Sequence, residues 1–560
     1  MSDIPKLRTQ RHALLGQGEP AIWLSGGMAA LAILMIVLLL GWVAWAGLST
    51  FWPLPVHKVA YVEGDKTVTI YGEPTRENTL VENGQSTSRT LYKSGNFDLT
   101  GTDFTWVRAD RTQSVATPNW AVIVERTEWG NAYGELEKVV VNGEEFAPAD
   151  RAWAKFQEVH PQMRELAERK QSIEKHAMGE INHDQNAIRL KLRAAAIRHG
   201  EGSQEHKQLE AELQKETADL EKRSLALREE LNKLEEQMRV ARIVVRTGSG
   251  QIVPADRTKP DEAMYVWQVV RAYPANNLGI GEKTGIYLSR WGEYLFDDPR
   301  EANMEGGVWP AIVGTVLMTM IMVVLVVPIG VIAAIYLREY AKQGLVVSIV
   351  RITVNNLAGV PSIVFGVFGL GFFVYLIGRN IDGFFFSERL PDPTIGKTAM
   401  LWASLTLSLL TLPVVIVATE EALAAVPRSL REASYGCGAT KWQTIWRVVL
   451  PRALPGVMTG AILAIARGAG EVAPLMLVGA VKLAPELPIA ASAPFFGADR
   501  SFMHLGFHIY DLGFQSRNSE AAKNMVYTTT LLLISLVVVL NLCAMWVRNR
   551  LRRGYQDGHF

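Results

Sequence analysis

The stretch REASYGCGATKWQTIWRVVLP, from Arg431 to Pro451, lies between two apolar segments, residues 400–418 and 457–481. It starts with polar and small residues, has Gly438 near its middle, and ends in an apolar run closed by Leu450-Pro451. This order predicts a short helix, a turn at the glycine, and a second helix that continues into the next apolar segment. A polar helix between two apolar segments is expected at a membrane surface.

The rest of the chain supports a membrane setting, because a helix needs about 20 apolar residues to cross the hydrocarbon core. Six stretches meet this requirement, namely residues 24–52, 309–337, 345–377, 400–418, 457–481 and 525–547. The third contains Gly359 and Pro361, so we expect a bent or packed helix there. The predicted fold class is an α-helical integral membrane protein with six transmembrane helices.

Charge is unevenly distributed along the 560 residues. Residues 53–305 hold 34 basic and 41 acidic side chains, whereas the remainder holds 23 basic and 15 acidic ones. The polar region is therefore an insertion between the first and second apolar stretches. The formal net charge of +1 argues against a nucleic-acid-binding protein. The chain has two cysteines, Cys437 and Cys543, and this number argues against a disulfide framework and against a structural zinc site in a protein of this size.

The orientation follows from the basic residues in the short connections. They occur near the N-terminus, between the second and third stretches, between the fourth and fifth, and in the tail: Lys6, Arg8, Arg11, Arg338, Lys342, Arg351, Arg428, Arg431, Lys441, Arg447, Arg452, Arg548, Arg550, Arg552 and Arg553. The positive-inside rule predicts that both termini are cytoplasmic and that residues 53–305 are extracytoplasmic. Ala44-Trp45-Ala46 resembles a signal-peptidase site, but the apolar run is long for a signal peptide, so we expect the first span to be retained.

The inserted region has α+β character. Residues 57–145 show short alternating strands with turn dipeptides at Asn83-Gly84 and Asn142-Gly143. Residues 163–242 predict a long antiparallel helical hairpin, because leucines recur every seven residues after a break at residues 200–203. Residues 243–300 return to strand patterns. We find no catalytic or metal-binding pattern here, and the region is interpreted either as a rigid spacer or as a docking platform for a partner.

The Arg431–Pro451 stretch matches a known motif. Glu432-Ala433-Ser434, Gly438 and the closing Leu450-Pro451 resemble the EAA pattern of ABC-importer permeases, with Ser434 in place of the second alanine. The resemblance implies that an EAA loop at residues 419–455 couples the chain to an ATPase subunit. The implied coupling residues are Arg431, Glu432, Ala433, Ser434, Gly438, Leu450 and Pro451. The alternative is an ordinary amphipathic helix at the interface.

Three further segments, residues 356–371, 412–434 and 464–475, resemble the PstA permeases of bacterial phosphate-specific ABC importers. The resemblance covers the first span and about residues 306–550. Residues 551–560 form a separate tail. It implies an inner-membrane location and phosphate as the substrate. The implied partners are a PstC-type permease, two PstB-type ATPase subunits and a periplasmic PstS-type binding protein. The chain has no phosphate-binding P-loop, so we expect no cofactor, and ATP is bound and hydrolysed by the partner subunits.

Arg467 and Glu471 are the strongest pathway candidates. They stand four residues apart in the fifth apolar stretch, where ionisable residues mark functional sites by default. An arginine suits a phosphate oxyanion, and the glutamate would hold it in place. The alternative is a structural ion pair. Ser362 and Thr411 are further polar candidates along the pathway. Small residues in the third and fifth stretches predict an interface with the partner permease: Gly359, Gly366, Gly460, Gly468 and Gly470.

Two other functions remain open at this point. The chemistry of an arginine site also fits another tetrahedral oxyanion, such as sulfate or molybdate. The long external hairpin also fits a mainly phosphate-signalling component that reports to a sensor kinase or its regulator. Neither function requires catalytic residues in this chain.

Overall fold

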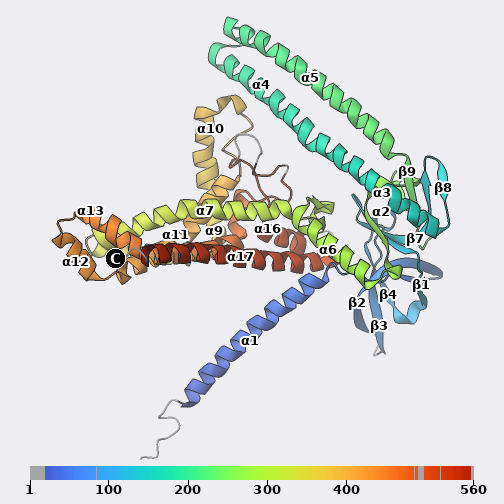
Figure 1. The fold of residues 1–560 in the computed structure, drawn as a ribbon, viewed down its shortest axis with the longest axis horizontal. Helices are drawn as coiled ribbons and strands as arrows, with labels where there is room; N and C mark the ends of the chain where they lie inside the picture. Colours follow the sequence, from blue (N-terminus) through green and yellow to red (C-terminus); the bar gives the residue numbers. More distant parts are fainter. Residues whose placement is uncertain (1–18, 83–84, 485, 490–496, 517–518, 557–560) are drawn as a thin grey trace, which may run out of the picture.

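The computed structural model describes residues 19–82, 85–484, 486–489, 497–516 and 519–556. Figure 1 shows a bundle of long helices in one part of the molecule and β-sheets with a long helical hairpin in the other. Helix α1 (Glu19–Ser49) stands apart from the bundle except near its C-terminal end, where it meets α17 (Ser519–Gln556) (Figure 1). The chain then forms the inserted region and enters the bundle through α6 (Ile280–Phe296), which leads into α7 (Trp309–Ile335). The predicted fold class, membrane helices with an inserted α+β region, is confirmed.

Within the described residues, six helices are long and apolar enough to cross a membrane. They are Ile22–Ser49, Trp309–Tyr340, Ser362–Phe385, Met400–Ala425, Lys441–Gly470 and Ala522–Arg550. The last five comprise α7 with η6 (Tyr336–Tyr340); α9 (Ser362–Phe368) with η7 (Gly369–Gly378) and α10 (Arg379–Phe385); α11 (Met400–Ala425); α13 (Lys441–Thr444) with η9 (Ile445–Val449) and α14 (Leu450–Gly470); and α17 (Ser519–Gln556). Helix α11 is central, since it packs against both α7 and α14.

The predicted bounds of the third span are wrong, because residues 345–377 do not form one helix. Helix α8 (Leu345–Leu357) ends, and α9 starts afresh at Ser362. Pro361 lies between them in an extended conformation, with φ −55° and ψ 135°. A proline disfavours the helical conformation in the residue before it and has no N–H to continue the ladder. The span is therefore displaced along the chain to Ser362–Phe385.

The fifth span also differs from the predicted residues 457–481. Its helix begins at Lys441, directly after the glycine turn, and ends at Gly470. Glu471 is extended, with φ −78° and ψ 133°, and a separate short helix α15 (Ala473–Val478) follows. Glycine is a weak helix former, and Pro474 fits best in the first turn of a new helix, so the apolar run is divided here.

The inserted region contains two main sheets in the described part of the chain. The first has the strand order β4-β3-β2-β1-β5, and the second β10-β11-β9-β7-β6-β12, with β8 beside β7. The strands are β1 (His57–Glu63), β2 (Lys66–Glu82), β3 (Gln85–Lys93), β4 (Phe104–Arg108), β5 (Thr112–Ala116), β6 (Ala121–Arg126), β7 (Asn131–Val141), β8 (Glu144–Phe146), β9 (Ala241–Arg246), β10 (Pro254–Asp256), β11 (Lys259–Tyr265) and β12 (Val269–Pro274). Short elements α2 (Phe97–Thr100), β13 (Pro299–Arg300) and β14 (Glu305–Gly306) complete it.

The predicted turn at Asn142-Gly143 joins β7 to β8, and both residues have positive φ, as a tight hairpin turn requires. The other predicted turn, Asn83-Gly84, lies outside the described residues, as do Lys6, Arg8 and Arg11.

The helical hairpin starts earlier than the predicted residue 163. Its first arm consists of α3 (Ala149–Ser172), the π-turn η2 (Ile173–Ala177) and α4 (Met178–His199), and its second arm is α5 (Gln204–Met238). The first turns of α3 bury Ala152 and Phe156 against the second sheet, so this part belongs to the sheet's core. Beyond it, α4 and α5 pack along a seam that includes Ile181 and Leu220. Figure 1 shows the hairpin reaching from the sheets toward α10.

The region 243–300, predicted as strands, also contains the 17-residue helix α6. This helix carries a buried charge network at the base of the insertion. Arg290 and Arg271 both donate to Glu125 on β6, and Arg271 also donates to Glu293. Arg290 in addition donates to the backbone oxygen of Phe51, just beyond α1, at 3.0 Å. The network therefore ties the sheets to the first membrane helix.

Candidate functional site

Arg467 lies in the last turn of α14, and Glu471 lies just beyond the end of that helix. The prediction placed both residues inside the span on one helix face, and for Glu471 this is wrong. The two side chains still meet, with Arg467 Nε and Glu471 Oε1 3.7 Å apart and with 34% and 21% of the side chains exposed. This separation is longer than a hydrogen bond. The guanidinium therefore keeps donors available at a break in a membrane helix.

Ser362 begins α9 and is half-buried. Helix α9 packs against α15, which follows Glu471 directly. The contact is close, because a Cβ at Gly366 would lie 2.8 Å from the Cα of Pro474. The structure thus brings the start of the third span near the helix break that follows Arg467.

Thr411 is placed differently. It is fully buried in α11, and its hydroxyl donates to the backbone oxygen of Leu407 at 2.9 Å. Its neighbours on α11 follow the same pattern, since Ser408 donates to the backbone oxygens of Ser404 and of Met322 on α7. Such hydroxyls satisfy themselves on helix backbones and join α11 to α7. The structure gives Thr411 a packing role inside this chain.

Three of the glycines predicted at a partner interface are used within this chain. A Cβ at Gly366 would collide with Pro474, one at Gly460 would lie 2.9 Å from Ala418, and one at Gly468 would lie 2.5 Å from Met322. For these three positions the interface prediction is wrong. Gly359 and Gly470 are exposed in this chain.

The EAA segment (Arg431–Pro451) folds as the sequence predicts. Helix α12 (Arg428–Gly436) is followed by Gly438 at φ 80°, and Thr440 then caps α13 by accepting from the backbone N–H of Gln443. The left-handed conformation at Gly438 favours glycine because other side chains are strained there. The second helix then runs without interruption into the fifth span.

Arg431 holds α12 onto the membrane helices. Its guanidinium donates to the backbone oxygens of Leu423 and Val426, at the end of α11, and to Glu339 Oε1 at 2.9 Å. Glu339 belongs to η6, which ends the second span. A cation at a helix C-terminus satisfies carbonyls that have no partner within the helix. One side chain therefore connects α12 to two membrane helices.

The other EAA residues divide between an inner and an outer face. Ser434 shares a hydrogen bond of 2.9 Å with the buried Thr444 hydroxyl, and Leu450 packs in the core formed by α7, α11 and α14. Glu432 and Ala433 are exposed. Pro451 is half-buried in the first turn of α14, where proline does not interrupt the helix.

An aromatic group beside these residues was not predicted. Trp442 and Trp446 stack with ring centroids 5.5 Å apart and are 58% and 56% exposed, and Tyr435 on α12 is 43% exposed. Large exposed aromatic side chains are typical of the centres of protein interfaces. The signal available in the sequence was the spacing of two tryptophans, i and i+4, in a polar loop.

No metal or redox centre is seen in the part of the chain that the structure describes. It contains no group of three or more His, Cys, Asp or Glu side chains placed to hold an ion, and both cysteines are exposed and free.

The family is established by comparison with known proteins. The family described as "Binding-protein-dependent transport system inner membrane component" matches residues 311–556. The chain is also 30% identical over 247 residues to the "Probable ABC transporter permease protein YqgI" of Bacillus subtilis, which covers 43% of this chain and 78% of that protein. The chain belongs to this family of ABC-transporter permeases. It is a multi-pass membrane transporter subunit and not an enzyme.

Two other relatives have more specific names. The chain is 39% identical over 195 residues to the "Phosphate transport system permease protein PstA 1" of Mycobacterium tuberculosis, covering 35% of this chain and 58% of that protein. It is 40% identical over 178 residues to the "Phosphate transport system permease protein PstA" of Mycobacterium leprae, covering 32% and 53%. The chain thus spans somewhat more than half the length of these two relatives.

Proposed function

We propose that this chain is the PstA-type permease subunit of an ATP-driven phosphate importer. The observation that carries the proposal is the loose Arg467–Glu471 pair at the break of the fifth span. The names of the two mycobacterial relatives support phosphate as the substrate.

In this proposal Arg467 binds the passing anion. A guanidinium presents a fork of donors that matches phosphate oxygens and remains charged at any physiological pH. Glu471, 3.7 Å away, offsets that charge when no anion is bound. An approaching phosphate replaces the carboxylate as the partner of Arg467, and Ser362 at the start of α9 is a further polar group on this side.

The EAA segment transmits the motion of the ATPase. Its exposed face, with Glu432, Ala433 and the two stacked tryptophans, is proposed to dock on a PstB-type subunit. Because Arg431 connects α12 to the ends of α7 and α11, a displacement of α12 reaches two membrane helices as a rigid-body movement. A PstC-type permease completes the pathway, and a PstS-type protein delivers phosphate.

The arrangement of the two parts supports the proposed orientation. Figure 1 places α12, α13 and the end of α17 at one end of the bundle and the inserted sheets at the other. With the EAA segment facing the cytoplasmic ATPase, residues 53–305 are extracytoplasmic and the tail at 551–560 is cytoplasmic. This agrees with the basic residues of the short connections.

Replacing Arg467 tests the proposal. Arg467→Gln is expected to abolish phosphate uptake in cells while the variant still assembles with its partner subunits. The matched control is Arg548→Gln, which removes a half-buried arginine near α14, where Arg548 contacts Thr459, and should leave uptake unchanged. Normal uptake by Arg467→Gln would refute the role of this residue. Competition by excess sulfate or molybdate would instead redirect the substrate assignment to another oxyanion.

A further inference from the structure

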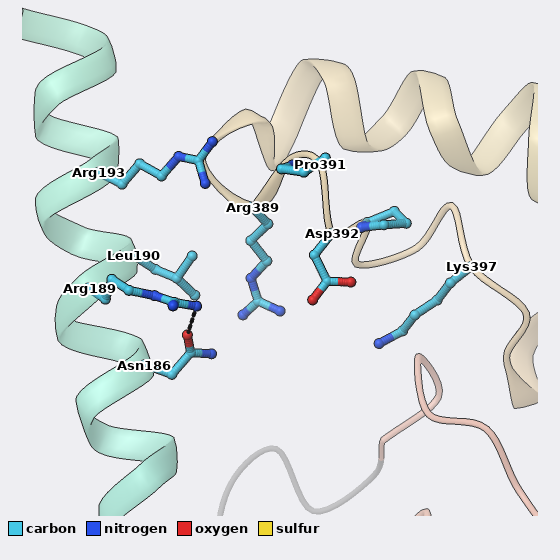
Figure 2. A pocket seen from close by; sticks show the side chains of 9 residues that line it. Asn186, Arg189, Leu190, Arg193, Arg389, Pro391, Asp392 and Lys397 are labelled. Atoms are coloured by element: carbon cyan, nitrogen blue, oxygen red, sulfur yellow. Dashed lines mark hydrogen bonds between the residues drawn. The ribbon is translucent and has the colours of Figure 1, made fainter.

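A cleft of about 320 Å³ lies between the helical hairpin and the loop that follows the third span. One wall is α4, and the other consists of residues 389–397. Figure 2 shows the side chains of both walls reaching toward the same space. The cationic side chains in the lining are Arg189, Arg193, Arg389 and Lys397, and the lining carboxylate is Asp392.

These four cations are not matched by carboxylates. Among the residues that the structure describes, none of the four forms an ion pair, and Arg189 is held only by the amide oxygen of Asn186 at 2.8 Å. The positive potential on this side of the cleft is increased by the neighbouring residues, because residues 185–200 include four basic residues and no acidic one. Like charges gathered around one cleft repel each other unless an anion occupies it.

The loop wall of the cleft is rigidly built. Asp382, which is completely buried, accepts hydrogen bonds from the backbone N–H groups of Ile395 and Gly396, the second at 2.6 Å. The indole of Trp402 donates to the backbone oxygen of Ile395. The backbone next to Lys397 is therefore held in place by buried contacts, which lowers the cost of ordering this wall when a ligand binds.

We propose that this cleft binds a phosphoryl anion, which bridges the hairpin and the membrane core. Arginine forks and a lysine are the groups that recognise phosphoryl oxygens, and three arginines with one lysine exceed the single carboxylate in the lining. The anion is either free inorganic phosphate or the headgroup of an anionic phospholipid. Bound anion would hold α4 against the turn η8 (Ser387–Arg389), which it already contacts.

The test uses the purified full chain with the pathway arginine removed, Arg467→Gln, so that binding at Arg467 does not contribute. The site variant adds Arg189→Gln and Arg193→Gln. The matched control adds Lys191→Gln and Arg198→Gln, which remove the same charge from exposed positions of the same helix outside the cleft. Each protein is placed in nanodiscs of phosphatidylcholine alone or with phosphatidylglycerol.

Two measurements are made, equilibrium binding of radiolabelled inorganic phosphate and amide hydrogen exchange of residues 185–193 and 387–397. Phosphate binding in phosphatidylcholine discs, weakened about tenfold or more in the site variant and retained in the control, identifies free phosphate. Protection that appears only with phosphatidylglycerol, and is lost only in the site variant, identifies the headgroup. No binding and no protection in either membrane, or equal losses in site and control variants, overturns the proposal. Uptake is not measured, so failure here does not bear on the proposed transport function.

Discussion

The base of the inserted region and the break in the fifth span both use arginine and glutamate, but they are built differently. Glu125 accepts hydrogen bonds from Arg271 at 2.5 Å and from Arg290 at 2.8 Å, and 8% of its side chain is exposed. Arg467 and Glu471 are 3.7 Å apart, and their side chains are 34% and 21% exposed. Each is therefore at least twice as exposed as the corresponding arginines and glutamate of the buried network. In the buried network the guanidinium groups already donate to carboxylate oxygens. In the Arg467–Glu471 pair the separation exceeds a hydrogen bond, so guanidinium donors remain available to a ligand. If Arg467 binds the anion as proposed, contact distance and burial distinguish the structural pair from the functional one.

Removing Glu125 should have the largest effect on stability. Burial opposes its ionisation, yet Arg290 and Arg271 outweigh that cost and hold the pKa of Glu125 below its usual range. Glu125→Gln leaves two buried guanidinium groups without their shared carboxylate, which is expected to destabilise the inserted region by about 3–5 kcal/mol. Thermal unfolding and proteolysis of the purified protein measure the effect.

The control for that variant is Glu145→Gln on β8. Glu145 pairs with Lys138 at the surface and is 58% exposed, so its removal is expected to cost less than about 1 kcal/mol. If Glu125→Gln were no more destabilising than Glu145→Gln, the buried network would not be what joins the sheets to the membrane helices.

Arg431 is a second tight site, and here the structure predicts a functional loss from a structural contact. Arg431→Ala removes hydrogen bonds to Leu423, Val426 and Glu339, each worth about 1.5–3 kcal/mol when one partner is charged. We expect α12 to lose its fixed position and uptake to fall about tenfold or more, with normal membrane insertion.

The comparison variant is Arg428→Ala, since Arg428 begins the same helix and is exposed. Uptake and ATPase stimulation in reconstituted transporter should be nearly unchanged by it. An equal loss in both variants would assign the effect to helix charge and not to the contacts of Arg431.

The sequence predicts the long helices of this molecule well, but it predicts the positions at which those helices break poorly. Apolar length is sufficient to find six spans, and the break at residues 200–203 is sufficient to find the hairpin turn. The ends of the third and fifth spans depend on Pro361 and on the glycines before Pro474, whose effect competes with a continuous apolar composition. Helix α6 was missed because its aromatic residues also suit strands.

Of the site, the helix, turn and helix of the EAA segment could be predicted from the residues, because they are local features, whereas its coupling role was implied by the resemblance. Thr411 shows the limit of such reasoning, since a threonine in an apolar helix gives no indication of which neighbour its hydroxyl will contact. The basic cleft joins residues about 200 positions apart in the chain, and no pattern along the sequence reports that meeting.

His504 and His508 are buried outside the predicted spans, and they differ from the charged pairs above because burial favours their neutral form. Burial lowers the pKa of His504 to about 3 and that of His508 to about 4. An unfolded histidine titrates near 6.5, so the unfolded chain binds protons first as the pH falls. The stability that the folded state gains by keeping these two histidines neutral is fully present above about pH 6.5. As the pH falls toward the folded pKa values, this contribution declines by about 1.4 kcal/mol per pH unit for each histidine.

His504→Asn separates this effect from packing. The asparagine oxygen can accept from the backbone N–H of Gly506, as His504 Nδ1 does at 3.1 Å, but it does not titrate. Thermal unfolding between pH 4.5 and 7.5 should show a smaller pH slope than that of the unmodified chain, because one of the buried histidines no longer titrates. An unchanged slope would mean that His504 is not the group being protonated.

Ser434→Ala is expected to have the smallest effect. It tests whether the buried hydrogen bond between Ser434 and Thr444 contributes to stability without contributing to uptake. Ser434 is where this chain departs from the EAA pattern, and its hydroxyl meets that of Thr444, a residue with no exposed surface. Alanine restores the pattern but leaves the Thr444 hydroxyl without that partner, which should cost about 1 kcal/mol. Thr444→Val alone should cost a similar amount, and the double variant should cost less than the sum of the two, because each single change removes the same hydrogen bond. Uptake should remain near normal in all three, since Arg431 still holds α12. A double-mutant cycle with additive losses would show that the two hydroxyls do not stabilise each other.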